Sequence, residues 1–292
     1  MKKRALAAGL LALILAAPTA EAKAPIAITN LAPTLSINFT GGDQVSAMAQ
    51  GAGAIYLTGT VESATPLLLT SQTLGGSDGF LVALSTNSSR VWDLRLGTSG
   101  DDVATSIYVD LIGNIWVAGA SAVSASTPAP GLNRLTVWEV NSAGQLINTY
   151  VRDVPEADVP TSIVAKGANF LLQGITSKAG SATFAATLNP AAKIGSLNYS
   201  SAKLPAASII KSTSSALYGW QSYVTSVAIK GVIGIALHQK TTVLAKYGIK
   251  DKALKTINSV TGSPMALQYQ SGTGVVLLTQ GKGYFLTIVH TK

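Results

Sequence analysis

Short apolar runs alternate with polar, glycine-rich turns along most of the chain, and the clearest case lies between residues 102 and 119. An alternating run at 103–110 is followed by the turn Leu111–Asn114 and by a second apolar run at 115–119. A Gly-Asn turn between two such runs is a β-hairpin signal. The pattern therefore predicts β-strands joined by tight turns.

The same pattern returns at a nearly constant interval. Aligning Met48, Ile107, Ile163, Ile209 and Leu267 gives spacings of 59, 56, 46 and 58 residues. Short strands repeated at this period are typical of propeller blades, each with four strands. We therefore predict an all-β fold, and within it a β-propeller of five four-stranded blades.

The ends of the chain complement each other in this scheme. The fifth unit ends with the run 284–289 and is one strand short, whereas the run 35–40 precedes the first hairpin as 91–96 precedes the second. Joining an N-terminal strand to the last blade closes a ring and removes exposed sheet edges. The pattern predicts that 35–40 supplies the missing strand.

The fourth unit is less regular than the others. Its apolar runs predict strands at 206–209, 216–219, 243–247 and 254–260. The stretch 224–242 is an additional apolar segment that the other units lack. It is either a displaced strand or an inserted hairpin.

Part of the chain resembles a known repeat. Residues 75–84, Trp92 and Gly100–Asp102 resemble the SBBP-type β-propeller repeat of exported bacterial proteins, and 109–119 resembles the central hairpin of that repeat. The likeness covers about residues 74–121. It implies a propeller outside the cytoplasm, without assigned chemistry. Because such folds host many functions, the resemblance does not supply one.

The first residues have the three-part build of a secretory signal peptide. Lys2–Arg4 are positive, residues 5–17 form an apolar run of thirteen, and Ala20 and Ala22 flank Glu21. A membrane anchor would need roughly 20 apolar residues. We expect cleavage after Ala22, a single mature domain at 23–292 without a membrane span, and a secreted or extracytoplasmic location.

Composition excludes several classes of protein. There is no cysteine, so disulfides and thiolate metal sites are excluded, and only 12% of residues are charged against 47% hydrophobic. The charge is uneven: residues 23–160 hold eleven acidic and five basic residues, whereas 161–292 hold thirteen lysines, no arginine and one acid. This predicts weak attraction to anionic polymers, without specific nucleic-acid recognition, because lysine is a point charge.

Three aspartates are the candidate catalytic residues. Asp43, Asp102 and Asp158 each precede the first strand of a unit, where side chains approach the mouth of a propeller channel. Glycoside hydrolysis needs two carboxylates roughly 5–9.5 Å apart. Equivalent repeat positions instead indicate one structural task, accepting hydrogen bonds from turn amides. We favour a non-enzymatic surface or envelope binding module; a glycosidase or lyase at the channel mouth is the alternative.

Two further groups are candidate ligand contacts. An aromatic cluster could stack on a sugar ring or pack between blades, and a group of lysines could bind anionic polymers or carbohydrate of the envelope. These residues are Tyr218, Trp220 and Tyr223, and Lys246, Lys250, Lys252 and Lys255. His238 and His290 are the only histidines and lie in different units. No metal site and no cofactor are therefore predicted.

Overall fold

The computed structural model describes residues 29–30, 32–38, 42–51, 53–62, 68–122, 134–202, 211–213, 221–228, 232–238, 241–247, 254–270 and 274–289. Only the backbone is described at 29–30, in the strands between 211 and 259, and at 264, 269–270, 274–275 and 289. All regular secondary structure in these ranges is β-strand. Within them, no helix is long and apolar enough to cross a membrane.

The strands form five sheets, numbered here by their order along the chain. The first sheet contains β3 (Gln44–Gly51), β4 (Ala54–Val61), β5 (Asp78–Leu84) and β6 (Arg90–Leu96). The second contains β7 (Asp102–Val109), β8 (Ile115–Ser121), β9 (Arg134–Val140) and β10 (Leu146–Asp153). The third contains β11 (Asp158–Lys166), β12 (Asn169–Thr176), β13 (Thr183–Leu188) and β14 (Asn198–Ser200).

The last two sheets each include an N-terminal strand. The fourth contains β15 (Lys211–Thr213), β16 (Gln221–Ala228), β17 (Val232–His238), β18 (Thr241–Tyr247), β19 (Leu254–Ser259) and, parallel to β19, β1 (Thr29–Asn30). The fifth contains β20 (Ser263–Gln270), β21 (Gly274–Gln280), β22 (Tyr284–Val289) and β2 (Leu35–Ile37).

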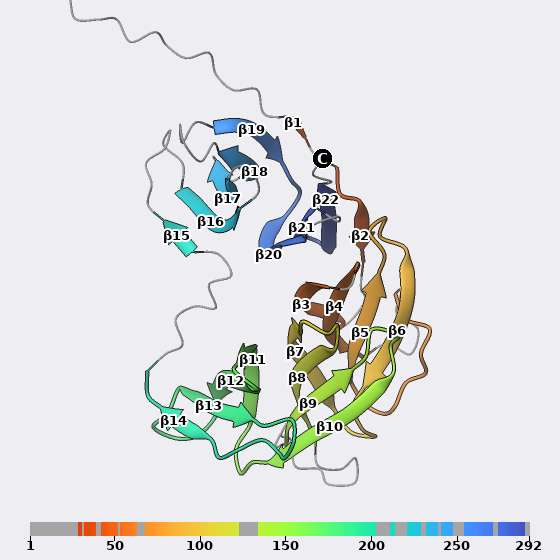
Figure 1. The fold of residues 1–292 in the computed structure, drawn as a ribbon, viewed down its shortest axis with the longest axis vertical. Coiled ribbons are helices and arrows are strands. Elements are labelled where there is room, and N and C mark those ends of the chain that lie inside the picture. Colours follow the sequence, from red (N-terminus) through yellow and green to blue (C-terminus); the bar gives the residue numbers. More distant parts are fainter. Residues whose placement is uncertain are drawn as a thin grey trace, which may run out of the picture.

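The sheets follow one another along an arc (Figure 1). In the first three, consecutive strands are neighbours, and the first strand of one sheet packs on the first strand of the next, β3 on β7 and β7 on β11. The third sheet lies at one end of the arc and the fourth at the other. Repeated four-stranded antiparallel sheets packed in this way make an all-β, propeller-like fold.

Each of the first three sheets has two chemically different ends. At the turn end, the first strand turns into the second and the third into the fourth. At the connector end, the second strand leads to the third and one sheet leads to the next, through short links at 97–101 and 154–157. Asp102 N donates to Ser77 O at 2.7 Å, which joins the connector ends of the first two sheets.

A bulge in the first strand recurs in these sheets. The register shifts between Val45 and Ala47 in β3, and at the matching places in β7 and β11. Opposite each bulge the second strand has a glycine: Gly59, Gly119 or Gly174. A Cβ at any of them would overlap a backbone carbonyl of the first strand and the ring of Phe80, Trp138 or Phe184 respectively. Glycine is therefore required for this close approach.

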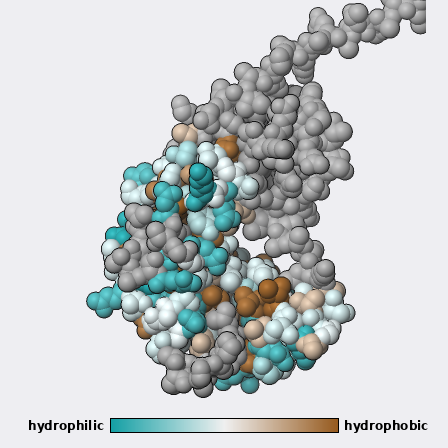
Figure 2. Space-filling view, turned by 180° about the vertical axis from the view of Figure 1, so that it is seen from behind, coloured by the Kyte–Doolittle hydropathy of each residue, from teal (hydrophilic) through white to brown (hydrophobic). Residues whose placement is uncertain are grey.

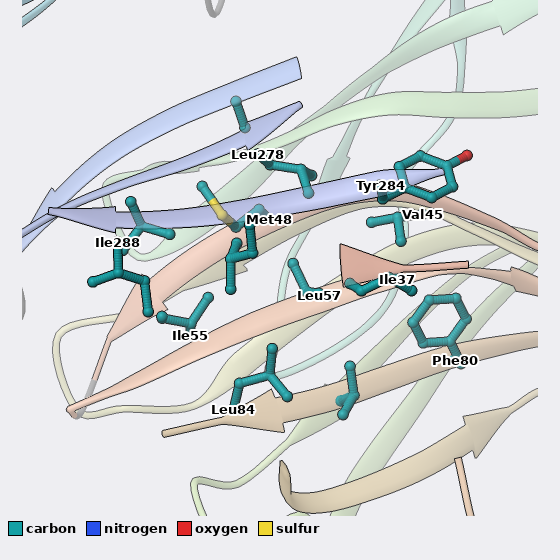
Figure 3. Packing of buried hydrophobic residues seen from close by; sticks show 14 of the residues in the cluster. Ile37, Val45, Met48, Ile55, Leu57, Phe80, Leu84, Leu278, Tyr284 and Ile288 are labelled. Atoms are coloured by element: carbon teal, nitrogen blue, oxygen red, sulfur yellow. The ribbon is translucent and has the colours of Figure 1, made fainter. Parts of the chain in front are cut away.

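Apolar clusters lie between neighbouring sheets. The first joins the fifth sheet to the first and includes Ile37 of β2, Leu57 of β4 and Leu286 of β22; Figure 3 shows the residues packed around Met48. A second cluster joins the first and second sheets, and a third joins the second and third. Burial of such side chains, about 1.5–3 kcal/mol for each large one, holds the sheets together.

The face of the third sheet that points away from the second sheet is partly exposed. Val159 pairs with Ile175 and Val164 with Leu171 across β11 and β12. Val164 is 43% exposed and Ile175 53% exposed. Figure 2, seen from behind, shows apolar side chains gathered in the lower right of the molecule, where this sheet lies.

The N-terminal strand β2 lies beside the partner predicted for residues 35–40, of which 39 and 40 lie outside the described residues. β2 covers Leu35–Ile37 and pairs antiparallel with β22, Leu35 opposite Leu286. Thr34 reinforces the contact, because its N–H donates to Leu286 O and its hydroxyl oxygen accepts from Ile288 N.

The fourth sheet departs from the four strands that the sequence predicted. It has six strands, and the described residues of the stretch 224–242 lie in β16, β17 and β18, which are consecutive neighbours. The strands predicted at 206–209 and 216–219 lie outside the described residues. In the third sheet the last strand, β14, has three residues, and Ile194 before it forms an isolated bridge to Leu188.

Candidate functional site

The three candidate aspartates lie at the connector end and are buried. Asp43 is 8% exposed, and Asp102 and Asp158 are fully buried. Asp43 Oδ1 accepts from Glu62 N at 2.6 Å, and Asp102 Oδ2 accepts from Thr98 N at 2.6 Å. Both carboxylates thus cap backbone amides of neighbouring loops, which is the structural task of such residues in turns.

Asp102 lies in a polar cluster between the first and second sheets. Burial raises its pKa, and hydrogen bonds from Ser121 and Thr98 act against this. Beside it, Asp78 Oδ2 accepts from Arg95 Nη1 at 2.7 Å, and both side chains are buried. The two buried charges compensate each other. Because Asp78 directly follows the loop before β5, the ion pair also fixes that loop.

The third aspartate has a side-chain partner. Asp158 Oδ2 accepts from the Tyr199 hydroxyl at 2.9 Å. Burial, together with the hydrogen bond to Asp158 and its charge, raises the pKa of Tyr199 to about 12. Lys178 Nζ lies 3.9 Å from the centre of the Tyr199 ring. The phenol is therefore a fixed donor that ties β14 to the start of β11.

At the turn end of the second sheet, a tight turn presents two aliphatic side chains. Asp110 Oδ1 accepts from Ile112 N at 3.0 Å and Asn114 N at 2.9 Å, and Oδ2 accepts from Trp116 Nε1 at 2.9 Å. Gly113 has a φ of +92°, which glycine adopts readily. Leu111 is 102% exposed and Ile112 83% exposed. The turn is rigid, yet its tip is apolar.

Glu139 connects this turn to its neighbour in the same sheet. The buried carboxylate accepts from Asn114 Nδ2 at 3.0 Å, from Asn148 Nδ2 at 2.8 Å and from the Tyr150 hydroxyl at 3.1 Å. Burial, followed by the hydrogen bond and charge of Glu139, raises the pKa of Tyr150 to about 12. The two turns of the second sheet are thus held by one carboxylate.

The neighbouring turns also dock onto aromatic side chains. Trp92 Nε1 of β6 donates to Ser142 O at 3.1 Å, and the Tyr150 hydroxyl lies 3.1 Å from Pro190 O as well as from Glu139. In each case an aromatic residue of an outer strand meets the last turn of the following sheet. These contacts fix the turn ends of adjacent sheets relative to each other.

Carboxylates and lysines differ in where they lie. Five of the eleven acidic residues in 23–160 are buried: Asp43, Asp78, Asp102, Glu139 and Asp158. The back-half lysines whose side chains are described are all exposed: Lys166, Lys178, Lys193 and Lys282. The acidic excess of the front half is therefore partly internal, whereas these lysines face solvent.

The remaining predicted ligand contacts are only partly described. Tyr218, Trp220, Lys250 and Lys252 lie outside the described residues, and Tyr223, Lys246 and Lys255 lie on β16, β18 and β19 with only their backbone described. In the described part of the chain, no three His, Cys, Asp or Glu side chains are grouped so as to hold a metal ion.

Sequence reasoning missed the Asp78–Arg95 pair and the apolar turn tip. The ion pair leaves no local signal, because its partners are on different strands of the hairpin. The tip could have been found, since two adjacent large aliphatic residues at the centre of a turn that opens with Asp and closes with Gly-Asn have no core to face.

Comparisons with known proteins give distant likenesses. No family model and no curated protein matches the chain. The structure is similar to a GH32 β-fructofuranosidase from Bombyx mori, at 11% identity and a TM-score of 0.42, over 89% of this chain and 58% of that one. It is also similar to a GH43 endo-arabinanase from Bacillus licheniformis, at 14% identity and a TM-score of 0.30, over 78% and 74%. The chain thus spans less than two thirds of the first enzyme.

Proposed function

We propose that the protein is an exported, non-enzymatic β-propeller that binds anionic polymers of the cell envelope. One observation carries the proposal: the described lysines of the back half are exposed, while five front-half carboxylates are buried. A surface with more exposed lysines than exposed carboxylates would attract polyanions electrostatically, and dissolved salt would screen this attraction. The signal-peptide pattern and the resemblance to exported SBBP repeats support export.

The contacts of the candidate aspartates favour this proposal over a glycosidase or lyase. A catalytic carboxylate must reach a substrate, but Asp102 and Asp158 are fully buried, and Asp43, Asp102 and Asp158 accept hydrogen bonds from Glu62, Thr98 and Tyr199. We expect Asp102→Asn to lower the stability of the fold. Loss of glycan hydrolysis with unchanged stability in that variant would favour the enzyme.

The binding test uses a dextran sulfate matrix and a salt series. Retention should fall as salt rises, and should fall further when Lys246, Lys250, Lys252 and Lys255 are all changed to glutamine. A second variant with Lys178→Gln and Lys282→Gln, two of the exposed lysines, should also lose retention, but less than the variant with four substitutions, because it removes two charges and not four. Retention that ignores both salt and the four substitutions would refute the proposal.

We also propose that the five sheets close into a ring, latched by β2. The exposed apolar face of the third sheet, with Val164 and Ile175, supports this, because the first and second sheets bury apolar residues on both faces. In a closed ring the fourth sheet covers that face. The antiparallel pairing of β2 with β22 supports the latch.

The absence of cysteine makes ring closure simple to test. Single variants Ile175→Cys and Ile112→Cys are labelled with a maleimide in the folded and the unfolded state. Closure predicts that Ile175→Cys is labelled slowly in the folded protein, while Ile112→Cys on the exposed turn is labelled fast. Equal folded-state rates would contradict closure. Deleting residues 23–40 should in addition lower the melting temperature strongly.

A further inference from the structure

The turn end of the second sheet exposes an unusual set of aliphatic side chains. Leu111 and Ile112 form the tip of the first turn, and Leu146 and Ile147, at the start of β10, are 48% and 45% exposed. Glu139 accepts hydrogen bonds from Asn114 and Asn148, which fixes the two turns relative to each other. The exposed apolar side chains are therefore presented by turns that hydrogen bonds hold in place, which lowers the cost of ordering them on binding.

The turn end also carries exposed cations. On the adjacent third sheet, the turn end carries Lys166, the last residue of β11, and Lys193, in the turn after β13, both exposed. The carboxylates at the turns of the second sheet, Asp110 and Glu139, accept hydrogen bonds from within the sheet. The turn end thus combines exposed aliphatic groups with exposed cations.

We infer that the turn end of the second and third sheets is a docking face for an anionic lipid surface. The inference rests on the export and the exposed lysines of the proposed function, and it adds an anionic lipid surface as a partner. Leu111 and Ile112 would enter the boundary between headgroups and acyl chains, while Lys166 and Lys193 meet anionic headgroups. Protruding aliphatic groups flanked by lysines are what interfacial binding requires. A soluble polyanion has no apolar phase to receive the tip.

The test is flotation of the purified protein with vesicles. Vesicles of phosphatidylglycerol and phosphatidylcholine should bind the protein, and pure phosphatidylcholine vesicles should bind it much less. Leu111→Ser combined with Ile112→Ser should lower the partition coefficient roughly tenfold or more, because two aliphatic side chains leave the lipid. Lys166→Gln and Lys193→Gln should lower it roughly fivefold each, and high salt should act in the same direction.

Matched controls lie at the opposite end of the sheets. Leu74→Ser removes a leucine that is 46% exposed in the link between β4 and β5, and Lys178→Gln with Lys282→Gln removes two exposed lysines. Leu74→Ser should bind vesicles as the unmodified protein does. The double lysine variant, which keeps Lys166 and Lys193, should lose less binding than either Lys166→Gln or Lys193→Gln. Absence of vesicle binding, or equal losses in control and test variants, would overturn the inference. Retention on dextran sulfate without vesicle binding would refute the lipid face while leaving the proposed function intact.

Discussion

The two ends of the sheets use the same repeat for opposite purposes. At the connector end, Asp78, Asp102 and Asp158 are fully buried and bound to Arg95, Thr98 and Tyr199. At the turn end, Leu111 and Ile112 are fully or mostly exposed on a turn that Asp110 holds. At the connector end the carboxylates are buried and stabilise the fold, whereas at the turn end the two aliphatic side chains are exposed and free to contact a partner. A charge counted along the sequence is therefore a poor guide to charge at the surface.

The largest expected effect is at the connector end. Asp78→Ala removes the carboxylate that faces buried Arg95, and should cost about 3–5 kcal/mol of unfolding free energy. Urea unfolding measures the loss. Asp153→Ala is the control, since its 2.8 Å pair with Arg134 is exposed and should be worth about 1 kcal/mol or less. Equal losses in the two variants would mean that burial does not set the strength of these pairs.

A smaller loss is expected from the bulge. Gly119→Ala places a methyl group against Val103 O and the Trp138 ring, and should cost about 1–3 kcal/mol by overpacking. Gly195→Ala is the control, because the nearest atom to its added Cβ is Thr187 O at 3.3 Å. The melting temperatures of the two variants decide the matter. If Gly119→Ala melts no lower than Gly195→Ala, the bulge does not require glycine.

Alkaline pH should weaken both ends through their tyrosines. Tyr199 and Tyr150 have a pKa of about 12 in the fold, against 10.0 for a free phenol. The folded state holds these protons more tightly, so their contribution to stability is complete below pH 10 and is lost as the pH rises through 12. Denaturant midpoints along this range should fall less in a Tyr150→Phe, Tyr199→Phe double variant. An unchanged pH profile in the double variant would contradict the assignment.

The smallest effect is expected at the turn tip. Leu111→Ser and Ile112→Ser remove side chains that have almost no packing in the fold, so stability should change by no more than about 0.5 kcal/mol. Thermal unfolding checks this. A large loss would show that the tip is covered by the protein itself, and the contrast between the two ends would then fail.

Residue patterns were enough to predict the repeat and the hairpin formed by β7 and β8. Gly-Asn and similar turns mark hairpin ends, and Met48, Ile107, Ile163 and Leu267 occupy matching places in β3, β7, β11 and β20. Ile209, the remaining residue of that alignment, lies outside the described residues. The sequence of the fourth sheet has no Gly-Asp-Asp or Gly-Asn element like those at 100–102 and 113–114, so its apolar stretch at 224–242 could not be divided into strands.

The site was less accessible to sequence reasoning than the fold. Matching positions of Asp43, Asp102 and Asp158 indicated a structural task, and their hydrogen bonds agree with it. Their burial could not be foreseen, since it depends on loops from other strands. The same is true of Glu139, whose three donors come from β10 and from the turn before β8.

The pairing of β2 with β22 sets an order of events during folding. Each of the first three sheets uses only its own consecutive residues, so each can form early with little loop-closure entropy. The contact of Thr34 with Ile288 instead spans 254 residues. The cluster that contains Ile37 and Leu286 cannot assemble until the last strand of the chain is available. We expect refolding to show a slow final phase that reports this cluster, and a chain shortened before Tyr284 to lack it.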